Sequence, residues 1–425
     1  MDLQKHIITR AMRNAIAAQC FGIQGVLVFR NSLMLLYLLA MQLAEARVLT
    51  YIAIYGLVCW GLTVPAAFLS DRMGKKRIGN VGHFLSISGF AVITLAAFLE
   101  DNFIKELSVV AGIVAFAGGQ AFFQSSWFPL LRPIVPPEIR GRYFGKMRMA
   151  WQIVGLLFFA LAGWLLALWG GISAYQLIMA VIVVFMFIRF LFYRKIPELE
   201  KSGKDGKTFF SVLKTVIRHE GYAPFGAYIF LITVFTAYAP ALFAMVEKEY
   251  LKINPATVVW FANMTMIGSV SGYLLGGMAV DRLGTKKVFM SCHFAFALVL
   301  FLFVMRGFFP VMMMPLLWTS HFIFGLVLAS SSIAITSEII ALMPAENQSF
   351  ATALLTSMLD AGMAASGFLC AFAVKLGFLK ENWTFFKMSM CNYDALILGF
   401  AVMIFILVIT LGLVPSVIKK AEWGG

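Results

Sequence analysis

The stretch DRMGKKR at residues 71–77 is a short basic turn between two long apolar runs. The chain contains a second such turn, DRLGTKK at residues 281–287, which also lies between two apolar runs. The offset of 210 residues that aligns the two turns also pairs His293 with His83 in the apolar runs that follow. A register that continues beyond the turn indicates an internal duplication. The sequence therefore predicts a chain of two related halves.

The composition is that of a membrane protein. The 425 residues are 61% hydrophobic and 13% charged, with a mean hydropathy of +0.88, whereas soluble domains are about 45–50% apolar and about 25% charged. A net charge of +14 would suggest nucleic acid as a partner in a soluble protein. Here the basic residues lie in short loops between apolar runs, so we predict the lipid bilayer and no nucleic acid as a partner.

The apolar runs are long enough to cross a bilayer, which takes about 20 residues in a helix. Runs of this length exclude barrel strands, and backbone groups cannot stay unpaired in lipid, so the spans must be helices. We predict twelve of them, near 16–43, 50–70, 78–99, 108–131, 143–169, 173–193, 222–245, 257–280, 287–308, 311–341, 349–375 and 394–416.

The basic residues also predict the orientation of the chain. An even number of spans places both termini on one side of the membrane, and the loops on that side hold most of the lysine and arginine residues. Cytoplasmic loops carry such an excess. We therefore predict a multi-pass protein of the cell's inner (cytoplasmic) membrane with both termini in the cytoplasm.

The halves are predicted to be two six-helix bundles, at residues 1–193 and 222–425, joined by a cytoplasmic linker at 194–221. The middle of the linker is polar. Over 207–218, apolar and basic residues alternate with helical spacing, which predicts a short amphipathic helix on the inner leaflet. A solvated helix that docks on the protein is the alternative.

The two turns resemble the signature loop of the major facilitator superfamily, Asp-Arg-x-Gly-x-Lys-Lys/Arg between the second and third and between the eighth and ninth spans. The second copy has the family's glycine four residues before the aspartate, at Gly277, where the first copy has Ala67. The resemblance implies an all-α fold of twelve transmembrane helices in two pseudo-symmetric bundles. It also implies a cavity lined by spans 1, 4, 7 and 10 and transport by alternating access.

The turns themselves are candidates for a conformational latch. Glycine allows a tight turn, and an aspartate at a helix end can accept hydrogen bonds from the N-terminus of a neighbouring helix. The family implies that this contact forms in one conformation and breaks in the other; plain topogenic charge is the alternative. The residues concerned are Asp71, Arg72, Gly74, Asp281, Arg282 and Gly284.

Arg30 lies near the middle of the first span, where a charge is expensive and suggests a function. On a continuous helix, Met34 and Tyr37 would share its face. Arginine keeps its proton, so Arg30 needs an anion. A substrate anion and a protein carboxylate are both possible partners. We include Tyr37 with Arg30 among the candidate substrate-binding residues.

Asp360 and His321 are the candidates for carrying a proton. Asp360 lies near the middle of span 11, and burial makes a carboxyl group easier to protonate. His321 lies in span 10 and can titrate near neutral pH, so it is a candidate for both proton and substrate binding. The alternatives are a carboxylate that hydrogen-bonds across helices and a histidine with satisfied contacts in the core.

Span 4 carries a polar face formed by Gln120, Gln124 and Trp127, which lie at helical steps of four and three. Amides beside a large ring suit a polar organic ligand, but polar side chains also hydrogen-bond neighbouring helices in membranes. At the inner ends of spans 4 and 10, Arg132 and Glu338 occupy nearly equivalent positions in the two halves. We predict that they pair to close the cytoplasmic mouth.

No motif indicates catalysis. The chain has no phosphate-binding glycine loop with lysine, no Ser/His/Asp arrangement and no metal-ligand spacing among its five cysteines. We predict no enzyme activity, no cofactor and no metal.

The predicted function is secondary active transport of a small, polar, anionic organic solute by a monomer, coupled to protons by symport. The alternative is a proton-driven exporter of amphipathic compounds such as drugs or lysolipids. The glycine-proline motif that family antiporters often carry in span 5 is absent from residues 155–163, which favours the first function. A non-transporting sensor on the same fold is a third possibility.

Overall fold

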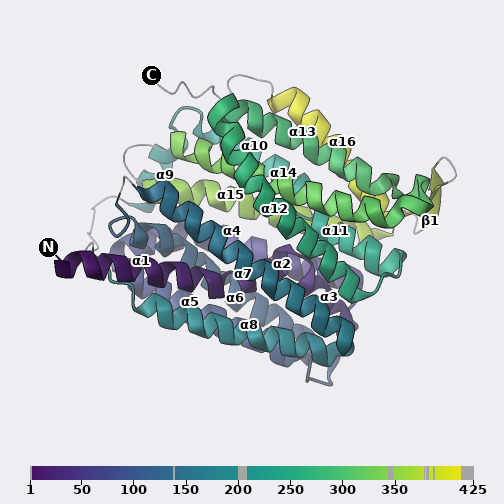
Figure 1. The fold of residues 1–425 in the computed structure, drawn as a ribbon, viewed down its shortest axis with the longest axis horizontal. Coiled ribbons are helices and arrows are strands. Elements are labelled where there is room, and N and C mark those ends of the chain that lie inside the picture. Colours follow the sequence, from purple (N-terminus) through teal and green to yellow (C-terminus); the bar gives the residue numbers. More distant parts are fainter. Residues whose placement is uncertain are drawn as a thin grey trace. The chain divides into compact units, whose positions relative to one another are not determined.

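The computed structural model describes residues 2–136, 139–199, 208–342, 348–377, 379, 382–385 and 388–412. Nearly all of these are helical (Figure 1). The helices of the first half are α1 (Asp2–Gly22), α2 (Gln24–Arg30), α3 (Leu33–Ala40), α4 (Glu45–Met73), α5 (Lys75–Ala96), α6 (Asn102–Leu131), α7 (Arg140–Leu168) and α8 (Gly171–Arg194).

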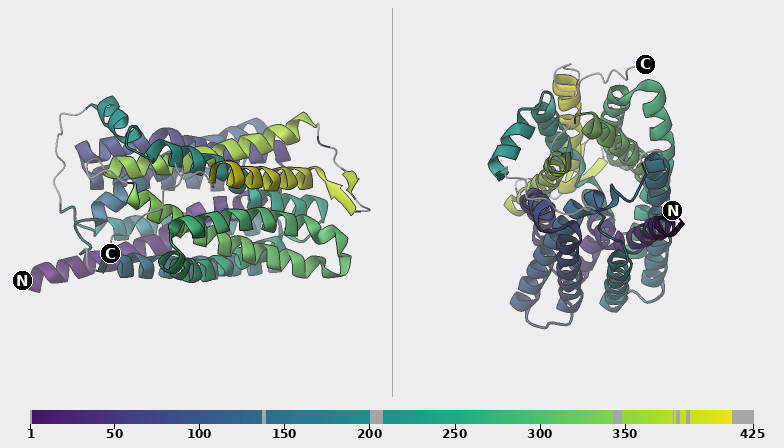
Figure 2. Two further views of the ribbon diagram at one scale, coloured as in Figure 1. Left: turned by 90° about the horizontal axis from the view of Figure 1, so that it is seen from above. Right: turned by 90° about the vertical axis from the view of Figure 1, so that its left-hand side faces the viewer.

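The remaining elements follow the linker. The helices are α9 (Phe209–Ile217), α10 (Tyr222–Thr236), α11 (Ala239–Met245), α12 (Pro255–Leu283), α13 (Thr285–Val304), α14 (Met313–Ala341), α15 (Gln348–Leu376) and α16 (Asn392–Leu407). Short π-helices cover Val246–Tyr250 and Val408–Gly412, and 3₁₀ turns cover Met305–Phe308 and Pro310–Met312. Strands β1 (Asn382–Phe385) and β2 (Met388–Cys391) pair antiparallel. Figure 2 shows this hairpin next to the N-terminal end of α16.

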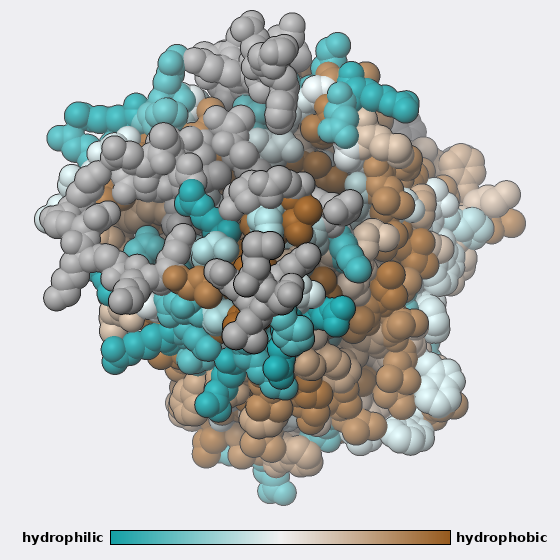
Figure 3. Space-filling model, turned by 60° about the vertical axis from the view of Figure 1, so that its left-hand side comes forward, coloured by the Kyte–Doolittle hydropathy of each residue, from teal (hydrophilic) through white to brown (hydrophobic). Residues whose placement is uncertain are grey.

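The predicted spans are confirmed. Within the described residues, eleven helices are long and apolar enough to cross a membrane, and a bent pair makes a twelfth if it is counted as one span. The prediction for the last span, 394–416, ends outside the described residues. On the face shown in Figure 3, hydrophobic side chains dominate the lower and right-hand parts, as expected for a surface in contact with lipid.

The first span differs from the prediction because it is broken. His6–Arg30 and Leu33–Ala40 meet at an angle of 63°. Ser32 has a left-handed backbone, with φ of 65°, and its Oγ donates a hydrogen bond to the Pro240 carbonyl at 2.9 Å. A serine and an asparagine separate α2 from α3. Side chains of these two types readily form hydrogen bonds with backbone groups outside a helix, which explains why the helix stops here.

The described part of the linker contains the predicted amphipathic helix as α9. Residues 200–207, the polar middle of the linker, lie outside the described residues. Span 7 is interrupted, since α10 ends at Thr236 and α11 starts at Ala239 with Pro240 in its first turn.

The chain forms two compact units. Unit 1 contains Met1–Arg30, Ile54–Lys214 and Asn347–Asp360, and unit 2 contains Asn31–Ala53, Thr215–Glu346 and Ala361–Gly425. The long helices α4 and α15 therefore contribute to both units. The boundaries predicted at 193 and 222 stay a prediction about the repeated halves.

Glycines allow the closest helix contacts within each unit. In unit 1, α5 and α6 lie side by side (Figure 1), and a Cβ on Gly89 would lie 2.4 Å from the Phe116 backbone nitrogen. In unit 2, a Cβ on Gly325 of α14 would lie 1.9 Å from the Thr265 carbonyl oxygen of α12. Small residues let helix backbones approach in membranes, where packing drives association. These contacts hold rigid the helices that carry the polar groups below.

Candidate functional site

The two signature turns need their glycines. Gly74 and Gly284 have φ of 106° and 82°, which side chains with a Cβ rarely adopt. Each glycine precedes a helix, α5 or α13. The carboxylate at the N-terminus of α5 is Glu198, which accepts hydrogen bonds from the backbone nitrogens of Lys75 at 2.7 Å and Lys76 at 3.3 Å. The latch role of the turns stays a prediction.

Arg30 is the last residue of α2, directly before the break in span 1. A cation is favourable at this end of a helix. Its side chain is exposed. Among the described residues it has no hydrogen-bond or ion-pair partner within contact distance. The face expected to join Arg30 to Tyr37 requires an unbroken helix, so the break removes that argument for grouping them. Tyr37 itself is fully buried on α3.

The structure brings Arg30 together with Asp360 and Tyr55, and we call these three residues the Arg30 cluster. Asp360 on α15 is 8% exposed and Tyr55 on α4 is 2% exposed. Arg30 lies within electrostatic range of both groups. The Asp360 Oδ2 has no hydrogen-bond partner among the described residues. The Tyr55 hydroxyl lies beside the Cys59 thiol, a weak partner that does not meet hydrogen-bond geometry. The cluster therefore combines a cation, an acid with an unpaired oxygen and a weakly bonded phenol.

Aromatic rings line one side of the Arg30 cluster. Phe29 stacks on Tyr55 with ring centroids 5.0 Å apart, and on Phe116 at 5.3 Å. The rings of Tyr55 and Phe116 are 5.7 Å apart. All three rings are buried, Phe116 completely. They form a packed apolar layer next to the charged groups.

A second polar cluster lies inside unit 2, and we call Glu247, His321 and Thr265 the Glu247 cluster. The His321 Nε2 lies 2.7 Å from the Glu247 Oε1, and the His321 Nδ1 lies 2.9 Å from the Thr265 Oγ1. Glu247 is completely buried, in the π-helix that ends span 7. A single π-helical turn often marks a functional site.

The Glu247 cluster has the contacts to bind one proton. The 2.7 Å contact needs one hydrogen between the two atoms, which is present when a neutral His321 donates its Nε2–H to ionised Glu247, and is kept when the pair takes up a further proton. The ring of Phe261 stacks on His321 at 5.3 Å and excludes water from one face. His321 was predicted as a proton or substrate site, and its contacts favour the proton.

An ion pair lies close to the Glu247 cluster. The Arg306 Nη2 donates to both carboxylate oxygens of Asp394, at 2.8 and 2.9 Å, and both residues are buried. The backbone nitrogen of Cys391 also donates to Asp394 at 3.0 Å. A paired and hydrogen-bonded arrangement is what buried charges require. These residues therefore stabilise the fold of unit 2.

The polar face of span 4 is mostly occupied by contacts in unit 1. The Gln120 Nε2 donates to the Ser86 Oγ of α5 at 3.1 Å, which supports the interhelical alternative for this residue. Trp127 is buried with its ring 5.1 Å from that of Phe123. Gln124 is half-buried. The contact to Ser86 supports a structural role for Gln120. The Trp127 Nε1 has no hydrogen-bond partner among the described residues, and the substrate contacts of Trp127 and Gln124 stay predictions.

The predicted gate pair is divided between the units. Arg132 follows α6 in unit 1, and Glu338 lies on α14 in unit 2. Glu338 is 3% exposed, and Lys286 lies within electrostatic range of it in the same unit. Pairing of Arg132 with Glu338 stays a prediction.

Sequence reasoning missed Tyr55, Glu247 and Glu198. Glu247 carried a usable signal, because it is an acidic residue only a few positions beyond an apolar run that contains Pro240. Tyr55 carried none, since tyrosines are common in spans. Glu198 follows span 6 directly. Within the described residues, no group of three or more His, Cys, Asp or Glu could hold a metal ion.

A family model described as Major Facilitator Superfamily matches residues 20–367. The chain belongs to this superfamily. It is therefore a multi-pass membrane protein of a family of secondary transporters, and the resemblance of the two turns is confirmed. Superfamily members are transporters rather than enzymes.

Solved structures share the fold of this superfamily member. A mutant of the nucleoside transporter NupG matches with a TM-score of 0.69 and 15% identity, covering 95% of this chain and 98% of the other. A peptide transporter POT in complex with sulfate matches with a TM-score of 0.70 and 14% identity, covering 96% of this chain and 97% of the other. A bacterial homologue of the iron transporter ferroportin in the inward-facing state matches with a TM-score of 0.67 and 12% identity, covering 96% of this chain and 99% of the other.

Proposed function

We propose that this superfamily member is a proton-coupled symporter of a small organic anion, which binds at the Arg30 cluster. The observation that carries the proposal is an accessible arginine in mid-span with no carboxylate in contact. Arginine does not lose its proton, so its charge needs an anion. A solute carboxylate, sulfonate or phosphate provides that anion.

Asp360 couples the solute to a proton. When ionised, Asp360 attracts Arg30 and competes with the solute, because the two groups lie within electrostatic range. Protonation of Asp360 removes this competition, so proton and anion bind cooperatively. The empty site holds Arg30⁺ and Asp360⁻, and the loaded site holds Arg30⁺, the anion and neutral Asp360. Both states are neutral overall and can pass through the conformational change without an unpaired charge.

The other contacts refine recognition. The hydroxyl of Tyr55 exchanges its weak contact with the Cys59 thiol for a hydrogen bond to the solute, and the packed rings of Phe29 and Phe116 hold Tyr55 in place. The Glu247 cluster binds a second proton in unit 2, which neutralises the pair of His321 and ionised Glu247 and is released once in each transport cycle. The termini are cytoplasmic on this proposal, which follows from the basic loops.

The test uses purified protein in vesicles that contain a pH-sensitive dye, challenged with carboxylates, sulfonates and phosphates. We expect one solute class to acidify the lumen. Asp360→Asn should abolish acidification but retain exchange of labelled solute for unlabelled solute, because the anion site remains. Arg30→Ala should abolish both activities, whereas Arg13→Ala, an exposed arginine on α1, should be normal.

Arg30→Lys separates charge from geometry. A lysine keeps the charge but lacks the planar fork, so we expect the apparent affinity to fall about tenfold, equivalent to the loss of one charged hydrogen bond. Normal transport by Arg30→Ala would refute the anionic solute. If no solute in the panel acidifies the lumen, the symport proposal fails and export of drugs and lysolipids becomes the hypothesis to test.

A further inference from the structure

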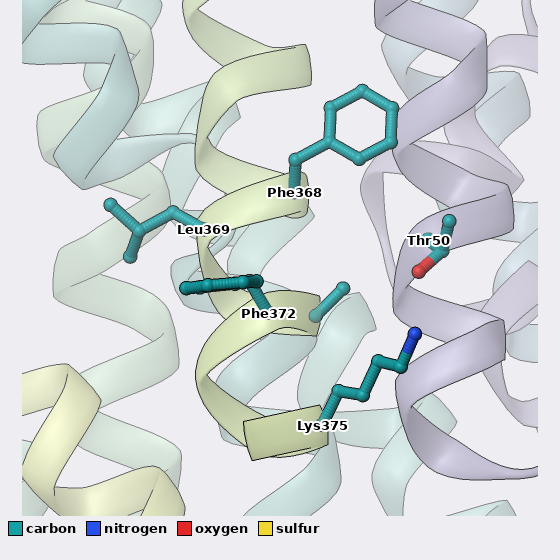
Figure 4. Close-up of a pocket in the computed structure, with 6 residues that line it drawn as sticks. Thr50, Phe368, Leu369, Phe372 and Lys375 are labelled. Atoms are coloured by element: carbon teal, nitrogen blue, oxygen red, sulfur yellow. The ribbon is translucent and has the colours of Figure 1, made fainter. Parts of the chain in front are cut away.

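Unit 2 contains a pocket of about 530 Å³ that none of the groups above uses. It is lined by Thr50 of α4 and by residues of the last turns of α15 (Figure 4): Phe368, Leu369, Ala371, Phe372 and Lys375. In this view Phe368 and Lys375 project from α15 towards α4. The volume lies in the range of small-ligand sites, about 300–1,000 Å³.

The pocket has one charged group and little other polarity. The Thr50 hydroxyl already donates to the Ala46 carbonyl oxygen at 2.7 Å, within its own helix. Lys375 is exposed in the last turn of α15 and has no hydrogen-bond or ion-pair partner in the described chain. Phe372 and Leu369 are 63% and 40% exposed. A ligand for this surface must therefore be apolar along most of its length and anionic at one end.

The depth of the pocket fits a lipid headgroup. Thr50 lies in the second turn of α4, and the same helix reaches the DRMGKKR turn at Asp71, 21 residues later. At 1.5 Å per residue this is about 30 Å, which equals the thickness of the hydrocarbon core. The pocket thus lies at the membrane boundary opposite the signature turns, where a lysine at a helix end extends to the headgroup region.

We propose that this pocket binds one anionic phospholipid of the leaflet opposite the signature turns. Its phosphate contacts the ammonium of Lys375, and its acyl chains lie against Phe368, Leu369 and Phe372. The charge of Lys375 selects anionic over zwitterionic lipid, since a zwitterionic headgroup offers no net charge to balance it. The proposal does not depend on which solute the protein transports.

The test titrates delipidated, full-length protein in detergent with phosphatidylglycerol or phosphatidylcholine of identical chains, and counts bound lipid by native mass spectrometry. We expect one tight phosphatidylglycerol and weaker phosphatidylcholine. Lys375→Ala should weaken phosphatidylglycerol about fivefold, which corresponds to the roughly 1 kcal/mol contributed by one basic residue near a membrane surface. Lys375→Arg should bind like the wild type.

Three controls make the outcome decisive. Lys252→Ala removes an exposed lysine of unit 2 that lies outside the pocket, and it should bind normally. Phe368→Ala should weaken both lipids alike. Glycerol phosphate, which is a headgroup without chains, should not compete. Equal affinity of wild type and Lys375→Ala, or equal losses in Lys375→Ala and Lys252→Ala, would overturn the proposal, and effective competition by glycerol phosphate would assign the site to a soluble anion instead.

Discussion

The Arg30 cluster of unit 1 and the charged groups of unit 2 differ in whether their charged side chains contact a partner of opposite charge. In unit 2, Arg306 grips both oxygens of Asp394, and His321 pairs with Glu247. In unit 1, Arg30 contacts no carboxylate, and Asp360 keeps an oxygen without a partner. An unpartnered buried polar atom costs about 1–3 kcal/mol. Such a cost is tolerated where a ligand supplies the missing partner. The Arg30 cluster therefore has the features of a binding site and the Arg306–Asp394 pair those of a support, while the Glu247 Oε2 in unit 2 also lacks a partner among the described residues.

The difference between the two units is tested most directly by making the same substitution, aspartate to asparagine, in each of them. Asp394→Asn leaves Arg306 buried without its counter-charge, and we expect a loss of about 3–5 kcal/mol in unfolding free energy. Asp360→Asn removes a charge that has no direct partner, and we expect no loss of stability. Thermal unfolding in detergent measures both variants.

A double replacement provides the control for the first effect. Arg306→Met combined with Asp394→Leu removes both charges and should recover part of the stability; the rest stays lost because the Cys391 backbone nitrogen no longer has its acceptor. Equal destabilisation by Asp394→Asn and Asp360→Asn would show that the two units do not differ in the way described.

A smaller effect is expected inside unit 2. Glu247→Gln keeps a hydrogen bond to His321 but removes the exchangeable proton, so stability should change by no more than about 1 kcal/mol while the number of protons moved per solute falls. Simultaneous measurement of dye acidification and labelled solute uptake gives this ratio. Thr265→Val, which removes only the hydroxyl contact to the Nδ1, should leave the ratio unchanged. An unchanged ratio in Glu247→Gln would restrict the cluster to a structural role.

The smallest effect concerns Tyr55. Tyr55→Phe removes a hydroxyl whose nearby side-chain partner is the weakly bonding thiol of Cys59, so the protein should be nearly as stable as the wild type. We expect the apparent solute affinity to fall about fivefold, equivalent to one hydrogen bond of about 1 kcal/mol. Solute uptake at a series of concentrations measures it. A loss of stability with unchanged affinity would place Tyr55 among the packing residues instead.

The candidate residues show where sequence reasoning stops. Arg30, Asp360 and His321 were found because a charge within an apolar run is visible in the sequence. Their partners were not. Tyr55 and Thr265 lie on other helices and carry no pattern of their own, and the acidic Glu247 beyond span 7 was visible but nothing in the sequence linked it to His321. Gln120 had two possible roles from the sequence, ligand contact and bonding to a neighbouring helix, and its bond to Ser86 supports the second.

The sequence by itself determined the spans, the repeated turns and the family, because apolar length, glycine at a positive φ and the placement of basic residues are local properties of the chain. Tertiary structure decided three things: the break after Arg30, the pairing of His321 with Glu247 and the isolation of Arg30 from any carboxylate. Each depends on contacts between segments far apart in the sequence, as when Ser32 bonds to the Pro240 carbonyl. In an apolar medium the location of every polar partner decides whether a charge supports the fold or binds a ligand.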